Sequence, residues 1–263
     1  MALAYWLPAV SWADGWSVQG FLNLQTPRLS DLAYHLAKLA DPAPFAVWTA
    51  AVAGIALYRR RPRHALAVVV MLGASNVVAQ ALKILLATDR SPDYLGRAQI
   101  NDASFPSGHA TASMGLALAL VLVSAPRWRP YVAIGGALFA LAISESIMLL
   151  AWHFPSDVFG GFLVATSFGL LTVAGLRAAE QRWPERSGRA AARRAFSSLD
   201  ARRLAVTVIA FVGAVLGGIA IAAGDATMHF AEHHTTAVFA AAAVAAMAAA
   251  LPVTVAALGA RRS

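Results

Sequence analysis

Cysteine is absent from the 263-residue chain, which excludes disulfide bridges and thiolate-bound metal sites. Charged residues are scarce as well: they make up 13% of the chain, against roughly 25% in soluble domains. Hydrophobic residues make up 59%, more apolar surface than a soluble protein of this length can hide. A bilayer accepts apolar residues in runs of about 20, and such runs recur here. The composition therefore predicts an all-α, multi-pass membrane helical bundle.

Seven apolar segments are predicted to form membrane-spanning helices. They are residues 43–58, 65–87, 107–124, 131–151, 157–176, 204–223 and 236–258. Residues 1–42 mix Trp with polar residues and are predicted to lie at the membrane interface, where Trp is favoured. The Arg-rich residues 177–203 are predicted to be a cytoplasmic linker. It separates a five-span core, residues 43–176, from a two-helix C-terminal hairpin, residues 204–263.

Basic residues are divided unequally between the two predicted sides of the membrane. Sixteen of the 21 Lys and Arg residues fall on one side, which the positive-inside rule assigns to the cytoplasm. The loops at 88–106, 152–156 and 224–235 then face outward. Anchoring beside anionic lipids accounts for the net charge of +8, so no nucleic-acid partner is expected. The Ala- and Arg-rich composition indicates a bacterial plasma membrane.

Three short segments whose side chains could bind a ligand or take part in catalysis fall on the predicted outer face. The first holds Lys83 and Arg90, which share a helical face if the second span continues to Pro92. The alternative is a snorkelling Lys and an interfacial Arg. Two such cations at the membrane surface are suited to binding a phosphate group.

The second segment, Phe105-Pro106-Ser107-Gly108-His109, opens the third span. Free N–H groups at a helix start bind anions, Ser107 can cap the helix or donate its hydroxyl, and Gly108 allows close backbone approach. His109 exchanges protons near neutral pH. An ordinary Ser cap followed by an interfacial His is the plainer interpretation.

The third segment runs from His153 to Asp157, between the fourth and fifth spans. A carboxylate beside an imidazole fixes its tautomer and makes it a stronger base or nucleophile. Asp157 also suits the first helical turn as a simple cap. Because the chain crosses the membrane twice between His109 and His153, both imidazoles return to the same face.

Together these segments resemble the signature of the type 2 phosphatidic acid phosphatase (PAP2) superfamily, K-x6-R-P, then P-S-G-H, then S-R-x5-H-x3-D. The resemblance covers roughly residues 70–175. It implies a helical-bundle core and hydrolysis through a phosphohistidine, with no metal or other cofactor. The residues that match the family's catalytic roles are His153 as nucleophile, Asp157 as its orienting carboxylate and His109 as the leaving-group acid. Those that match its phosphate-binding roles are Lys83, Arg90, Ser107 and Gly108.

The chain departs from this pattern in two places. Ser91 separates Arg90 from Pro92, and Ile147 stands where the family has the Arg of its third motif. Arg97 is the nearest replacement cation by topology. Glu145, a carboxylate inside an apolar span, is expected to be protonated or paired with a cation, or else hydrogen-bonded to Ser144 or a backbone carbonyl.

The resemblance predicts a membrane phosphatase acting on a lipid phosphate at the outer leaflet. Polyprenyl diphosphate, phosphatidic acid and phosphatidylglycerol phosphate all suit the family. Three alternatives stay open: a phosphotransferase using a lipid phosphate donor, a non-catalytic lipid-phosphate binder, and a transporter. The spacing of His229 and His233 permits a metal ligand pair, but few other ligands lie nearby, so no metal site is expected.

Overall fold

The computed structural model describes residues 7–88, 100–183 and 230–260, and these ranges are helical with no strand. The all-α prediction is therefore confirmed. The predicted sixth span, residues 204–223, lies outside the described residues. The helices are α2 (Pro8–Asn23), α3 (Pro27–Lys38), α4 (Pro42–Tyr58), α5 (Pro62–Leu85), α6 (Gly108–Val123), the 3₁₀ helix η2 (Pro126–Trp128), α7 (Arg129–Leu149), α8 (Pro155–Arg182) and α10 (Thr235–Ala260).

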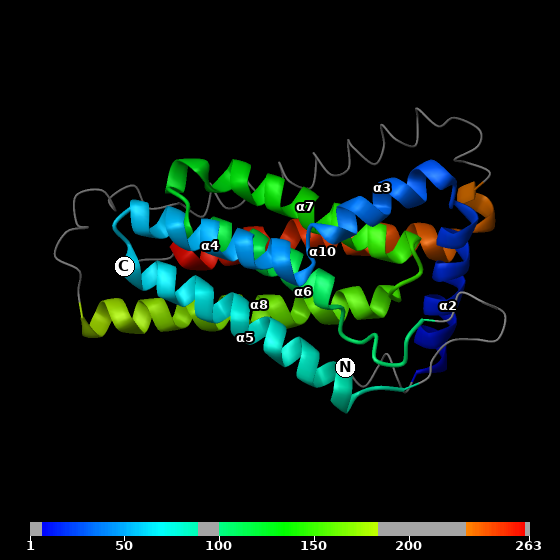
Figure 1. Cartoon of the computed structure of the whole chain (residues 1–263), viewed down its shortest axis with the longest axis horizontal. Helices are drawn as coiled ribbons and strands as arrows, with labels where there is room; N and C mark the ends of the chain where they lie inside the picture. Colours follow the sequence, from blue (N-terminus) through cyan, green and yellow to red (C-terminus); the bar gives the residue numbers. More distant parts are fainter. Residues whose placement is uncertain (1–6, 89–99, 184–229, 261–263) are drawn as a thin grey trace.

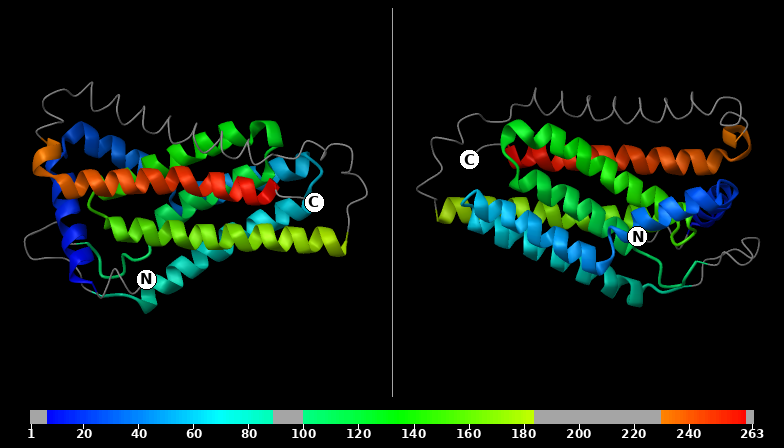
Figure 2. Two further views of the ribbon diagram at one scale, coloured as in Figure 1. Left: turned by 180° about the vertical axis from the view of Figure 1, so that it is seen from behind. Right: turned by 45° about the horizontal axis from the view of Figure 1, so that its top comes forward.

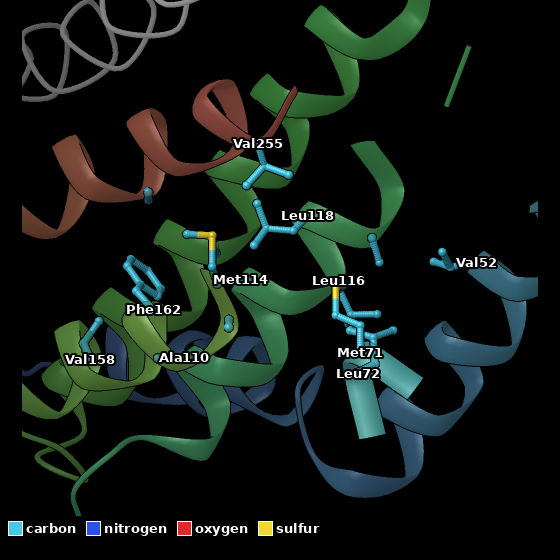
Figure 3. Close-up of a cluster of buried hydrophobic side chains, with 14 of the residues drawn as sticks. Val52, Met71, Leu72, Ala110, Met114, Leu116, Leu118, Val158, Phe162 and Val255 are labelled. Carbon is cyan, nitrogen blue, oxygen red and sulfur yellow. The ribbon is translucent and has the colours of Figure 1, made fainter. Parts of the chain in front are cut away.

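Helix α6 occupies the centre of the bundle, in contact with α4, α5, α7, α8 and α10 (Figures 1 and 2). Its residues are apolar on all sides and 13 of the 16 are buried, as expected for a helix with no solvent- or lipid-facing side. In Figure 3, Met114 of α6 lies beside Phe162 of α8, and Leu118 lies beside Val255 of α10. This packing fixes the start of α6 relative to the start of α8.

Four helical segments are long and apolar enough to cross a membrane, among the residues described: α5, η2 with α7, α8, and α10. Helices α3 and α4 satisfy the same criterion only as a pair, bent by 51°. At 16 residues, α6 is about 24 Å long, less than the hydrocarbon core of about 30 Å. Because other helices surround α6, most of its length contacts protein. The chain is a multi-pass membrane protein.

Residues 7–42 contain two helices with different placements. Helix α2 lies across one end of the bundle (Figure 1) and exposes Trp12 and Trp16. That this helix lies in the membrane interface stays a prediction. Helix α3 instead packs against α7 and leads into α4 through the bend. The predicted first span, residues 43–58, is thus only the second half of a bent helical arm.

The two ends of the bundle differ in chemistry. One end carries the α4–α5 turn, η2 and the end of α8 (Figure 1), with basic residues on each of them. Helix α8 reaches Arg182, beyond the predicted span end at residue 176, so the predicted linker begins within this helix. The opposite end carries α2, the end of α5 and the starts of α6 and α8. All the described motif residues lie at this second end.

Candidate active site

Two helix N-termini meet at the end of the bundle that carries the motif residues. Helix α6 begins after its cap Ser107, and α8 begins at Pro155. The backbone N–H of Ser107 donates a hydrogen bond to the carbonyl oxygen of Asp157 at 2.9 Å. The second and third sequence motifs, 46 positions apart from Ser107 to His153, are therefore joined directly through their main chains.

Adjacent glycines in α8 make this close approach possible. A Cβ on Gly160 would lie 2.6 Å from the ring of Phe105, and one on Gly161 would lie 2.6 Å from the carbonyl oxygen of Ser107. Both distances are too short for real side-chain contacts. The pair of glycines thus lets the loop before α6 rest directly on the first turns of α8, a feature that the motif comparison did not single out.

The imidazole of His153 is paired with Asp157, as the sequence predicts. His153 Nδ1 lies 3.4 Å from Asp157 Oδ2, at the long end of the hydrogen-bonding range, and both side chains are buried. The same Oδ2 accepts a hydrogen bond from the backbone N–H of Phe154 at 2.9 Å. Asp157 therefore acts both as the helix cap and as a partner for His153. Nε2 of His153 is the ring nitrogen left for an electrophile.

Ser107 caps α6, with its Oγ accepting a hydrogen bond from the N–H of Ala110 at 3.3 Å. The side chain is fully buried, and its hydroxyl hydrogen is left for a ligand. The N–H groups of Gly108 and His109, in the first turn, have no intrahelical acceptor. At the positive end of the α6 dipole, these groups are suited to binding an anion, and the anion-binding role itself stays a prediction.

His109 lies across the site from His153, with 6.3 Å between the ring centroids. Its side chain is 23% exposed, more than that of His153. His109 Nε2 lies 3.1 Å from Oδ1 of Asp41, the residue that precedes α4. The sequence interpretation assigned no partner to His109, so this contact is new.

Lys83, near the end of α5, interacts electrostatically with both Asp157 and His109, which places its charge at the site. Helix α5 ends at Leu85, so the condition under which Lys83 and Arg90 were expected to share a helical face, a second span that continues to Pro92, is not met. The helix ends too early to carry both residues on one face. Arg90 and its possible substitute Arg97 lie outside the described residues.

Two acidic residues at the site come from the N-terminal segment and were missed in the sequence. Asp41 is followed by Pro42 and an apolar run, which signals a helix start but names no partner for its carboxylate. Asp14 is a lone acid inside α2, 5% exposed, and accepts hydrogen bonds from Ser156 at the start of α8. In the sequence, Asp14 is the only acid among residues 1–30, and nothing in that segment identifies its partner.

Two further residues singled out in the sequence lie on α7. Ile147, at the position of the family's third-motif Arg, is fully buried within the main apolar cluster. Oε1 of Glu145 and Oγ of Ser144 are buried, and neither has a hydrogen-bond partner within the described part of the chain. The structure therefore shows neither the expected cation nor the expected Ser144 bond at that oxygen.

Metal ligands do not gather in the residues that the structure describes: no three His, Asp or Glu side chains there are placed to hold one ion. His229, half of the candidate pair with His233, lies outside those residues. The site is thus composed of two imidazoles, carboxylates that contact them, a helix N-terminus and an ammonium group.

The sequence and the helical bundle are both similar to those of known membrane proteins. The family model of the PAP2 superfamily matches residues 64–181. A protein named undecaprenyl-diphosphatase, from Sulfolobus acidocaldarius, is 26% identical over 164 residues, which are 60% of this chain and 78% of the relative. The family match takes in the described motif residues, and the relative aligns with the greater part of the chain.

A solved structure shares the fold. It is titled as the crystal structure of the first transmembrane PAP2 type phosphatidylglycerolphosphate phosphatase from Bacillus subtilis. The two folds align with a TM-score of 0.58 at 22% sequence identity, over 69% of this chain and 92% of the other. Residues 64–181 of the chain are thus similar to the PAP2 superfamily, and the fold agrees with that similarity.

Proposed function

We propose that this protein is a membrane lipid phosphate phosphatase that hydrolyses a lipid phosphomonoester or diphosphate through a phosphohistidine. One observation carries the proposal: the buried His153–Asp157 pair faces His109 beside the N-terminus of α6. A nucleophile, an acid and an anion-binding corner are the parts that phosphoryl transfer needs. The match to the PAP2 superfamily and the names of the two similar proteins support the same reaction class.

In the first step, Nε2 of His153 attacks phosphorus, and the bond from phosphorus to the leaving oxygen breaks. Asp157 holds Nδ1–H and stabilises the positive charge that develops on the ring. His109 gives its proton to the departing oxygen. Lys83, the Ser107 hydroxyl and the first N–H groups of α6 stabilise the phosphoryl oxygens. We propose that Arg90 adds a second cation.

In the second step, water attacks the phosphohistidine and the phosphorus–nitrogen bond breaks. His109, now neutral, takes the proton from this water, and inorganic phosphate leaves. The net reaction consumes one water and returns both imidazoles to their starting states. Side-chain cations and N–H groups provide the charge stabilisation that a metal provides in other phosphatases. We therefore expect the reaction to need no metal.

Access to the site suits a lipid substrate. His109 and His153 lie at the end of the bundle, next to α2, where a headgroup can arrive by lateral diffusion in the membrane. The basic residues cluster at the other end, and by the positive-inside rule we propose that the site faces the extracytoplasmic side. We also propose that the membrane is a bacterial plasma membrane. Undecaprenyl diphosphate, phosphatidic acid and phosphatidylglycerol phosphate are the candidate substrates.

The test is phosphate release by purified protein in detergent with EDTA, across these three substrates. At least one lipid should be hydrolysed, and His153→Ala should lose both turnover and the acid-labile phosphoenzyme. Complete loss of activity in EDTA, restored by a divalent ion, would contradict the metal-independent mechanism. A glycerol or lipid alcohol acceptor added to the assay distinguishes a phosphotransferase, because phosphate would then appear on the acceptor.

One observation favours a second function, that of a non-catalytic lipid-phosphate binder. Ile147 is apolar and buried, whereas the family has at this position an Arg that binds phosphate. The site therefore lacks one positive charge that the family pattern includes. A folded protein that binds lipid phosphate and releases no phosphate from any of the substrates would support this second function. The intact His153–Asp157 pair is the reason to place hydrolysis first.

A further inference from the structure

His109 contacts a carboxylate that lies outside the region matched by the family. Asp41 immediately precedes α4, at the bend between α3 and α4, and the family match begins only at residue 64. Its Oδ1 lies 3.1 Å from Nε2 of His109, within hydrogen-bonding distance. The residues are 68 positions apart, so the contact depends on how the bent arm packs onto the bundle.

A closed ring of side chains holds this pair in place. Lys38 Nζ lies 3.4 Å from Asp41 Oδ2 and 5.0 Å from the ring centroid of Tyr34. Tyr34 meets Trp152 edge-on at 6.1 Å, and Trp152 lies 5.8 Å from the ring of His109. His109 is thus held by Asp41 at its ring nitrogen and by Trp152 at its side.

The charges around His109 explain why a carboxylate matters there. Burial is the largest effect that disfavours a positive charge on its ring, and His153 from the α7–α8 loop and Lys83 from α5 disfavour that charge as well. Asp41 from the bend is the carboxylate that acts in the opposite direction, among the described residues. A leaving-group acid has to hold a proton in this cationic surrounding before the bond to the leaving oxygen breaks.

We propose that Asp41 is a positioning residue for His109, the second His–Asp pair of a site built from two. This inference rests on the proposed function. Asp41 accepts the hydrogen bond from one ring nitrogen, which leaves the other to give its proton to the departing oxygen. After that transfer, the neutral ring keeps its remaining N–H on Asp41 and can take a proton from water in the second step.

The experiment compares two substitutions with the same chemistry. Asp41→Asn keeps the shape of the side chain and removes its charge. The matched control is Asp31→Asn on α3, where the side chain is 75% exposed and lies 3.6 Å from His35. Two substrates separate the roles: a lipid phosphate, whose alkoxide leaving group needs a proton, and p-nitrophenyl phosphate, whose leaving group departs as an anion.

Asp41→Asn should lower kcat on the lipid phosphate by about 10- to 100-fold, part of the 10²–10⁴-fold that general acid catalysis contributes. KM should change little, since Asp41 is not placed on the phosphate. The rapid burst of p-nitrophenolate, which reports phosphohistidine formation, should stay within about twofold of wild type. Asp31→Asn should match wild type in both assays. Asp41→Glu should recover part of the lost kcat.

Equal loss with both substrates, or an increase in KM alone, would overturn the proposal in favour of a structural or substrate-binding role for Asp41. Unchanged kcat on the lipid would overturn it outright. Thermal melting of each variant identifies misfolding, and Asp41→Glu provides a second folded variant for the comparison. Wild-type protein with no activity on any substrate contradicts the phosphatase function instead, so the two failures are distinguishable.

Discussion

Asp14 of α2 accepts two hydrogen bonds from Ser156, one from the backbone N–H at 3.1 Å and one from the hydroxyl at 2.5 Å. The two residues are 142 positions apart, and both are buried. Ser156 lies between His153 and Asp157 in the sequence. The helix that crosses the end of the bundle is therefore tied to the turn that carries the proposed nucleophile.

The first prediction concerns this tie. Asp14→Asn leaves an amide N–H₂ opposite a donor and removes charge-assisted hydrogen bonds, each of which contributes about 1.5–3 kcal/mol. We expect a lower melting temperature and lower phosphatase activity, because the turn with His153 loses its anchor. A double-mutant cycle with Ser156→Ala should show non-additive effects on the free energy of unfolding. Additive effects would mean that the contact contributes nothing to stability.

The second prediction tests the close packing of α8 on the loop before α6. Gly161→Ala puts a Cβ 2.6 Å from the carbonyl oxygen of Ser107 and 3.0 Å from the N–H nitrogen of Thr111, both main-chain atoms. Overpacking of this kind costs about 1–3 kcal/mol. Phosphate release should fall with stability, since Ser107 and His109 move away from His153.

Gly175→Ala is the matched control for that substitution. Gly175 lies on the same helix, and a Cβ there meets nothing within 4 Å. The change should be neutral or stabilise the helix by about 0.5–1 kcal/mol. Equal effects of the two substitutions, measured by thermal melting in the same detergent, would show that the close approach at Gly161 is not required.

Sequence patterns predict those parts of the molecule that depend on local chemistry. Apolar runs place α6 and α10 within one or two residues of their observed ends, because helix length and hydropathy are properties of a single segment. The pairing of His153 with Asp157 was predictable for the same reason, since four positions across a helix start bring the side chains together. The motif match then supplied their roles.

Contacts between distant segments were not predictable in this way. Asp41 and His109 have no common pattern in the sequence, and their contact requires the bend between α3 and α4. The early end of α5 at Leu85 was also missed, because the apolar run continues to Leu86 and Ala87 with no breaker before Pro92. Tertiary packing decides such features, and one sequence gives no direct signal of it.

The third prediction concerns the side of the membrane that the site faces. The chain has no cysteine, so single cysteines can be placed without background. Asp102 and Arg127 are both exposed. The carbonyl oxygen of Asp102 accepts the N–H of Thr88, just beyond the end of α5, whereas Arg127 lies in η2 at the opposite end of the bundle. On intact cells, an impermeant thiol reagent should label Asp102→Cys and spare Arg127→Cys. Labelling of Arg127→Cys alone would reverse the proposed orientation.

The fourth prediction concerns Ile147, the apolar residue at the position of the family's third-motif Arg. Its side chain is fully buried beside the turn of His153, and its carbonyl oxygen accepts the N–H of Trp152 at 2.9 Å. Ile147→Arg would place a guanidinium within the apolar cluster. An unpaired charge in such a place costs several kcal/mol, so the ligand-free variant should melt at a lower temperature than wild type.

Bound phosphate should reverse that loss. A charge-assisted contact contributes about 1.5–3 kcal/mol, so phosphate or vanadate should raise the melting temperature of Ile147→Arg more than that of wild type. Turnover of the preferred lipid phosphate should rise roughly tenfold or more if the contact is kept in the transition state. Ile147→Met, of similar volume and uncharged, should differ little from wild type in either measurement. If Ile147→Arg instead loses activity and gains no extra stabilisation from phosphate, another cation already fills that position, and Arg90 and Arg97 become the residues to replace next.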